Sequence, residues 1–152
     1  MKRDTKIVFA VVAAIPSFIL TASLACSWAI AHGASMKWRL LFRTMCHGIV
    51  SRSIDVFGAP MPVCARCAGI YLGMLIGLAA FAAFPFVSER VMRIAAIAAV
   101  TPLAIDGFTQ MARLRESTND LRMATGIAAG FAFGMWVLSA IERRSDTAVT
   151  TS

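Results

Sequence analysis

The sequence predicts an all-α fold, an integral membrane four-helix bundle. Its mean hydropathy is +0.73 and only 15% of its 152 residues are charged, a composition too apolar for a soluble domain of this size. Four stretches are long and apolar enough to cross a bilayer, which takes roughly 20 residues because the backbone in hydrocarbon must satisfy its own hydrogen bonds. Two of these stretches carry glycine at every fourth residue, the spacing with which membrane helices pack closely.

The expected spans are residues 7–31, 68–87, 91–111 and 121–141. We expect one transmembrane domain over residues 1–144 and a disordered tail over 145–152. The only long connector, 33–66, begins with "MKWRLLFRTM", which mixes apolar and basic side chains. This pattern is typical of a short helix that lies on the lipid headgroups.

The second and fourth spans align with each other at a constant offset. The glycines that coincide are Gly69, Gly73 and Gly77 with Gly126, Gly130 and Gly134. The chain is therefore either two repeated helical hairpins that point the same way across the membrane or a single bundle with two small-residue packing faces. Both interpretations place the second and fourth helices near the centre of a tight bundle.

Basic residues flank the spans on both faces of the membrane. Of the 15 Lys and Arg residues, seven lie on the face with both termini and eight on the other face. If several of those eight are held in a site, the positive-inside rule places both termini in the cytoplasm, and we expect a multi-pass protein of the cell (inner) membrane. Nucleic acid is excluded as a partner because the basic residues do not form one patch.

The connector between the first two spans carries a candidate metal site. Cys64 and Cys67 have the Cys-x-x-Cys spacing with which two thiolates reach one ion, and Cys46 and His47 offer two further ligands. Thiolate and imidazole ligands select zinc first and iron next. Cys26 lies in the middle of the first span and is expected to pack there as a small apolar side chain.

Three alternatives stay open for these cysteines. Cys64 and Cys67 at a helix start also match the thiol-disulfide oxidoreductases, in which case no metal is needed and Cys46 relays electrons. Neighbouring residues rarely point at one ion, so His47 is alternatively a proton carrier or a hydrogen-bonding neighbour of a ligand, with His32 or Asp106 as the fourth ligand. The thiols can also simply be buried packing groups.

A polar cluster lies on the same face of the membrane as the cysteines, because an even number of spans separates the two loops. Asp106, Gln110 and Arg113 recur at helical spacing, with Asp106 about a turn and a half inside the end of its helix. A carboxylate at that depth needs a partner, and the candidates are Arg66 and Arg122. Its role is either functional or that of a structural ion pair.

The motifs resemble those of a family of small prokaryotic membrane proteins of unknown function. They are "CHG", "RSI", "PVCARCAGIYLG", "IDGFTQ" and "STNDLRMATGIAAG", and the resemblance extends from Cys46 to Gly134. It implies one module that contains Cys46, His47, Cys64, Cys67, Asp106, Gln110, Asn119 and Arg122. The family usually has Thr where this chain has Ala68, so no hydroxyl can act there. The second half also resembles VanZ-like proteins, which are linked to cell-envelope glycopeptide resistance.

We therefore expect one of two functions. The first is a membrane metalloenzyme that acts on the anionic head group of a lipid or a polyprenyl phosphate. In it, the metal ligands are Cys46, His47, Cys64 and Cys67; the catalytic groups are Asp106, His47 and Gln110; and the substrate-binding residues are Arg52, Arg66, Arg113, Asn119 and Arg122. The second is a membrane thiol-disulfide oxidoreductase that uses Cys64 and Cys67. Metal transport or sensing ranks last, because the first two helices supply almost no polar residues that thread the bundle.

Overall fold

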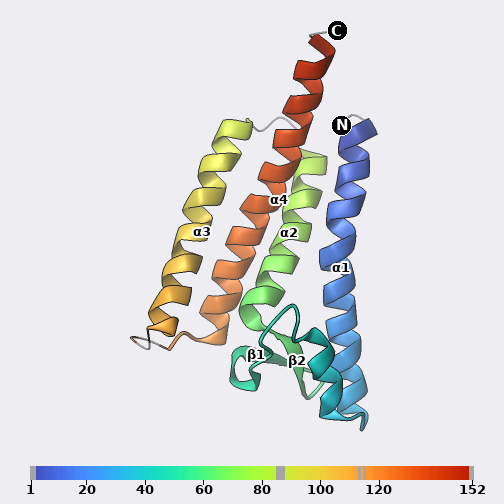
Figure 1. The fold of residues 1–152 in the computed structure, drawn as a ribbon, viewed down its shortest axis with the longest axis vertical. Coiled ribbons are helices and arrows are strands. Elements are labelled where there is room, and N and C mark those ends of the chain that lie inside the picture. Colours follow the sequence, from blue (N-terminus) through green and yellow to red (C-terminus); the bar gives the residue numbers. More distant parts are fainter. Residues whose placement is uncertain (1–2, 85–87, 113, 115, 151–152) are drawn as a thin grey trace.

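Four long helices dominate the computed structural model, which describes residues 3–84, 88–112, 114 and 116–150. They are α1 (Arg3–Ala31), α2 (Ala65–Ala83), α3 (Glu89–Met111) and α4 (Asn119–Thr150) (Figure 1). Each contains a stretch long and apolar enough to cross a membrane, which confirms the four predicted spans. α4 continues to Thr150, whereas the sequence analysis predicted a disordered tail from residue 145; neither Gly nor Pro follows Gly134 to end the helix.

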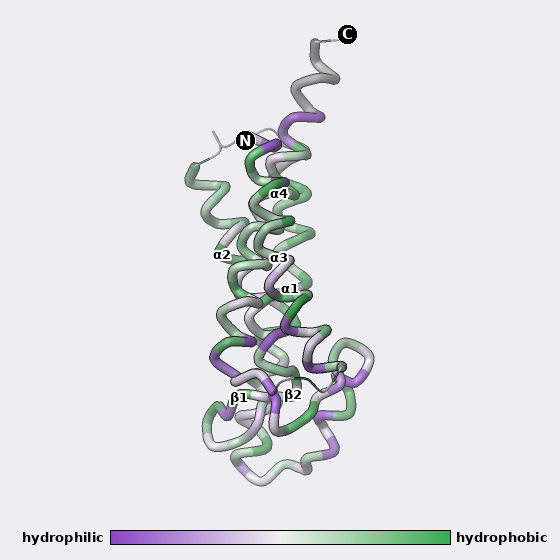
Figure 2. The backbone as a smooth tube through the Cα atoms, turned by 90° about the vertical axis from the view of Figure 1, so that its left-hand side faces the viewer, coloured by the Kyte–Doolittle hydropathy of each residue, from purple (hydrophilic) through white to green (hydrophobic). Residues whose placement is uncertain are grey.

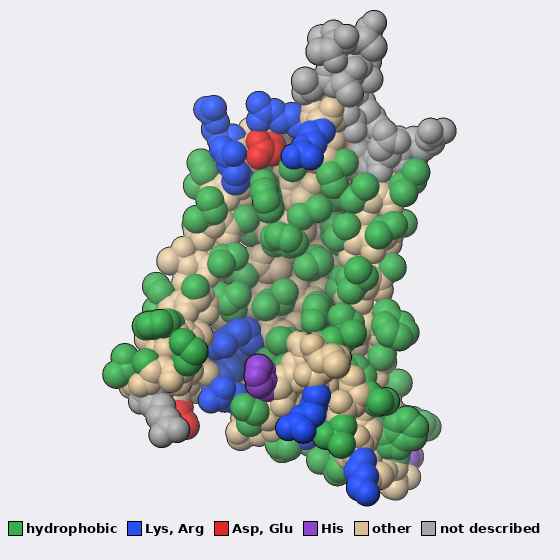
Figure 3. Space-filling model, in the orientation of Figure 1, with side chains coloured by type: hydrophobic (Ala, Val, Ile, Leu, Met, Phe, Trp, Pro, Cys, Tyr) green, Lys and Arg blue, Asp and Glu red, His purple; other side chains and the backbone are tan. Residues whose placement is uncertain are grey.

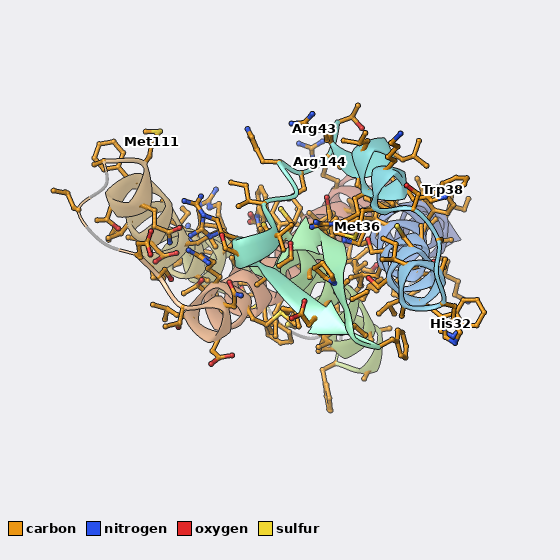
Figure 4. The ribbon with its side chains drawn as sticks, turned by 90° about the horizontal axis from the view of Figure 1, so that it is seen from below. His32, Met36, Trp38, Arg43, Met111 and Arg144 are labelled. Carbon is orange, nitrogen blue, oxygen red and sulfur yellow. The ribbon has the colours of Figure 1, made fainter. Side chains whose placement is uncertain are left out.

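The helices stand in a row in the order α3, α4, α2, α1 (Figure 1). α2 packs most extensively on α4, while α3 packs on α4 and α1 packs on both α2 and the connector that precedes α2. The view along the helices shows α3 and α1 at opposite edges of the row (Figure 4). α2 and α4 lie between these two edges, which confirms the prediction that they form the centre of the molecule. They also run in the same direction.

Glycines bring the α2 and α4 backbones into contact. A methyl group added at Gly73 would overlap the backbone of Ile127, and one added at Gly130 would overlap the backbone of Ile70. Backbone atoms cannot swing aside as a flexible side chain can, so only glycine fits these positions. The two glycine ridges identified in the sequence therefore form one helix-helix interface.

The outer helices present apolar side chains to their surroundings. Phe18 of α1 is 70% exposed and Ile97 of α3 is 65% exposed. A band of hydrophobic side chains separates basic groups at the two ends of the molecule (Figure 3), and hydropathy along the backbone follows the same division (Figure 2). This is the surface expected of a protein that spans a bilayer.

The connector between α1 and α2 starts with the predicted short helix, which is a 3-10 helix, η1 (Met36–Phe42). Trp38 and Leu41 on it are exposed, as expected for contact with headgroups. Arg39 is instead buried, and its guanidinium donates hydrogen bonds to the carbonyl oxygens of Gly48 (3.1 Å) and Met61 (2.9 Å). η1 is thus held against the rest of the connector by an arginine that the sequence pattern assigned to the surface.

A β-hairpin, which the sequence did not predict, completes the connector in an otherwise helical fold. After a second 3-10 helix, η2 (Val50–Arg52), strands β1 (Ser53–Val56) and β2 (Ala59–Cys64) pair antiparallel. Phe57 and Gly58 both have positive φ, 59° and 84°, as a tight two-residue hairpin turn requires. β2 contains Pro60 and Pro62. Proline lacks an N–H donor, so a sequence with two prolines in six residues does not predict a strand.

Candidate functional site

Three cysteines converge where β2 passes into α2. Cys46 follows η1, Cys64 is the last residue of β2 and the N-cap of α2, and Cys67 lies in the first turn of α2. Their Sγ atoms all lie within 4.8 Å of one another. The hairpin achieves this by folding the connector back, so that residue 46 meets residues 64 and 67.

Backbone N–H groups point at two of the sulfur atoms. The Cys64 amide donates to Cys46 Sγ (3.3 Å), and the Cys67 amide donates to Cys64 Sγ (3.5 Å). Donors of this kind stabilise a thiolate relative to a thiol. The thiols of Cys64 and Cys67 also donate to Cys46 and lower its pKa, although burial acts in the opposite direction.

The donor set fits a soft metal ion. In a tetrahedral zinc site with Zn–S bonds of about 2.3 Å, sulfur atoms lie about 3.8 Å apart. The three Sγ atoms lie within 4.8 Å of one another, so each pair would need to move closer by about 1 Å at most. Three thiolates match zinc or iron and not magnesium or calcium, which take oxygen ligands. Cys46, Cys64 and Cys67 are the residues that would hold the ion.

The two histidines lie apart from this cluster. His47 is exposed; it lines the same cavity as the cysteines but, among the described residues, does not join the close group of thiols. His32 bonds through Nδ1 to the carbonyl oxygen of Trp28 (2.8 Å) and stacks on that indole ring. His32 sits at the outer edge of α1 (Figure 4), so the alternative that used it as a fourth ligand is wrong.

A chain of polar contacts joins α2, α3 and α4 beside the cysteines. Arg66, which lies between Cys64 and Cys67, forms an ion pair with Asp106. Gln110 donates from Nε2 to Asp106 Oδ2 (2.9 Å) and accepts at Oε1 from Arg122 (3.1 Å). Of the two arginines proposed as partners of Asp106, Arg66 contacts it directly and Arg122 reaches it through Gln110.

The start of α4 is tied to the hairpin by Asn119. Its Oδ1 accepts from Arg122 (2.7 Å), and its Nδ2 donates to the carbonyl oxygen of Ser53 (3.1 Å). Asn119 thus fixes the position of the Arg122 guanidinium relative to β1.

Two cavities share one wall of arginine side chains. The first, of about 340 Å³, is lined by the three cysteines and His47 as well as by this wall. The second, of about 520 Å³, is lined also by Gly107, Met111 and Glu116. The shared residues are Arg52, Arg66, Gln110 and Arg122. We call the second cavity the arginine cavity.

The arginine wall contains guanidinium N–H donors that have no hydrogen-bond partner among the described residues. Arg122 is only 6% exposed and, among the described residues, bonds only to the neutral side chains of Asn119 and Gln110. The Nε atoms of Arg66 and Arg122 are buried without a hydrogen-bond partner in the described structure. Buried cations normally pair with an anion, so the wall is suited to bind one. Arg113, also predicted to bind substrate, lies outside the described residues.

Arg39 shapes the site, although its sequence context did not predict this role. It bonds Gly48, Met61 and the Ser53 hydroxyl, and so holds both sides of the connector that carries Cys46 and Cys64. Its position among Trp38, Leu40 and Leu41 in an amphipathic segment gave no signal of burial.

Comparison with known proteins identifies relatives but no activity. Residues 46–136 match a family described as "Predicted membrane protein (DUF2085)". The uncharacterized protein MJ1492 of Methanocaldococcus jannaschii is 36% identical over 133 residues, which are 80% of this chain and 83% of that protein. An uncharacterized protein of Methanothermobacter thermautotrophicus is 39% identical over 100 residues, 66% of this chain and 88% of that protein. No solved structure matches.

Proposed function

The chain belongs to the family of predicted membrane proteins DUF2085, and we propose that it is a zinc-binding membrane enzyme that acts on an anionic lipid or polyprenyl-phosphate head group. The observation that carries the proposal is the placement of Arg66. It lies between two clustered cysteines and pairs with Asp106, so a thiolate metal site and an anion-binding wall adjoin each other where a lipid head group would lie.

The proposal assigns a role to each part of the site. Cys46, Cys64 and Cys67 hold the zinc ion, which would supply Lewis acidity. Arg52, Arg66 and Arg122 bind the anion, since guanidinium groups match the geometry of phosphate oxygens. Gln110 and Asn119 orient Arg122 through the bonds described above.

Proton transfer falls to the two remaining groups. Asp106, which is paired with Arg66, acts as the base. His47 is exposed at the wall of the cysteine cavity, where its imidazole can exchange protons with water and with a bound head group.

A second candidate function is thiol-disulfide exchange. Cys64 caps α2 and accepts the amide of Cys67, the arrangement that activates the attacking thiol in such enzymes, and Cys46 lies close enough to receive electrons from the pair. This function leaves the bonds among Asp106, Gln110 and Arg122 without a role. Metal transport or sensing would need a polar path along α1 and α2.

The proposed location is the inner membrane, with both termini in the cytoplasm. Arg39, Arg66 and Arg122 on the opposite face are engaged in the contacts described above and are not free loop charges, so they count less in the positive-inside rule. The bilayer is the expected partner, and nucleic acid is not.

Metal analysis of detergent-purified protein tests the proposal. We expect one zinc ion per chain, lost in Cys64→Ser and kept in Cys26→Ser, the matched control outside the cluster. A metal-free protein that gains two thiols on reduction would favour the redox function instead. Mass spectrometry of phosphatidic acid and a polyprenyl phosphate incubated with the zinc-loaded protein tests the enzyme activity, with Arg122→Gln as the inactive variant.

A further inference from the structure

An apolar groove runs between α3 and α4 on the lipid-facing side of the molecule. Its volume is about 570 Å³, within the range of about 300–1,000 Å³ typical of small-molecule sites. Ala96, Val100 and Ala104 of α3 line it with small side chains, and Phe133 and Trp136 of α4 line it with aromatic rings. Such a surface accommodates a hydrocarbon chain.

The groove lies close to the arginine cavity along α3. Ala104 in the groove and Gly107 in the arginine cavity are three residues apart on one face of α3. Gly107 lies beside Arg66, since a methyl group there would lie 3.6 Å from the Arg66 guanidinium, an ordinary van der Waals distance. The apolar and cationic sites are therefore neighbouring parts of one surface.

The length of the groove matches one leaflet of a bilayer. It extends from Arg93 to Ile105, and 12 residues at 1.5 Å rise give about 18 Å. Half of a hydrocarbon core of about 30 Å is about 15 Å. A chain that starts at the arginine cavity would thus be covered for roughly the thickness of one leaflet.

The charges of the arginine cavity favour a phosphate at its mouth. The described lining carries three guanidinium groups against the carboxylate of Glu116 and the neighbouring Asp106. The free Nε donors of Arg66 and Arg122 add to this preference for an anion. A phosphate monoester supplies both the negative charge and several acceptor oxygens.

We propose that a lipid with a phosphomonoester head group binds here, with its phosphate in the arginine cavity and one hydrocarbon chain in the α3–α4 groove. The inference rests on the anion site of the proposed function and names the form of the ligand and its route of entry. The ligand enters sideways from the bilayer, between α3 and α4, and the groove selects for a long chain.

Native mass spectrometry of the purified protein with phosphatidic acid tests this inference. Ala104→Phe fills the groove, and Ala98→Phe adds the same ring to an exposed position of α3 that does not line it. We expect Ala104→Phe to weaken binding of phosphatidic acid by about tenfold or more, while binding of inorganic phosphate and zinc content stay unchanged. Ala98→Phe should bind as the unaltered chain does, and Arg122→Gln should lose both phosphatidic acid and inorganic phosphate.

A second measurement avoids substitutions in the groove. In a Trp28→Phe/Trp38→Phe chain, Trp136 is the remaining tryptophan, and brominated phosphatidic acid should quench its fluorescence more than brominated phosphatidylcholine at equal mole fraction. Equal quenching, or equal binding by Ala104→Phe and Ala98→Phe, would overturn the inference and indicate ordinary surrounding lipid. If the protein contains no zinc but Ala104→Phe still weakens binding of phosphatidic acid, the proposed zinc enzyme is refuted and the lipid site is not.

Discussion

Replacing Asp106 with alanine should destabilise the protein more than the loss of one surface charge would. Asp106 is 8% exposed and accepts from both Arg66 and Gln110. Without it, the Arg66 guanidinium stays near the centre of the site with no carboxylate among its described contacts, and Gln110 Nε2 loses its acceptor. The cost comes from these stranded partners and not only from the lost attraction.

The size of the effect follows from burial. Removing one partner of a buried ion pair costs about 3–5 kcal/mol, and because the Arg66 side chain keeps 23% of its surface exposed, we expect the lower end, about 3 kcal/mol. For a chain of this length 1 kcal/mol corresponds to about 2–4 °C in Tm. The expected loss is therefore about 6–12 °C.

A double-mutant cycle followed by circular dichroism in detergent provides the assay. Asp106→Ala/Arg66→Met removes both charges and should unfold at a higher temperature than Asp106→Ala, because no guanidinium is left unpaired. If the Tm losses of the two single variants simply add in the double variant, the two groups are not coupled and the argument for an ion pair at this site is refuted.

Two further predictions concern the packing of the helices and of the connector. Gly73→Ala should lower the free energy of unfolding by about 1–3 kcal/mol, because the added methyl group meets the backbone of Ile127. Thermal unfolding measures this loss of stability. A smaller loss in Gly73→Ala than in Leu72→Ala would contradict the prediction. Arg39→Met removes the hydrogen bonds that hold the hairpin, so it should speed amide hydrogen exchange in β2 and reduce zinc content. Arg43→Met, at an exposed position beside the same 3-10 helix, should change neither the exchange rate nor the zinc content.

The helices and their central interface could be predicted from the sequence because each depends on local pattern. Length and hydropathy determine the spans, and the glycine at every fourth residue, as at Gly73 and Gly130, identifies the contact between α2 and α4 without knowledge of any other contact. The placement of the cysteines and Asp106 at the same end of the molecule followed from topology alone, since an even number of spans returns the chain to the same face.

The hairpin and the exact partners could not be predicted in the same way. Pro60 and Pro62 lie in a strand that tertiary contacts stabilise, although proline in a sequence predicts against a strand. Arg39 is buried only because the folded connector offers carbonyl groups to it. The choice of Arg66 over Arg122 as the direct partner of Asp106 depends on how the helices are rotated about their axes, which hydropathy does not specify.

X-ray absorption at the zinc edge, together with the metal content of the purified protein, tests the central claim that Cys46, Cys64 and Cys67 form one metal site. The account predicts one zinc ion per chain with three sulfur neighbours at about 2.3 Å, and the loss of that ion in Cys67→Ser. A zinc ion with only oxygen and nitrogen neighbours, or a protein without metal in which two of these cysteines form a disulfide, would contradict it.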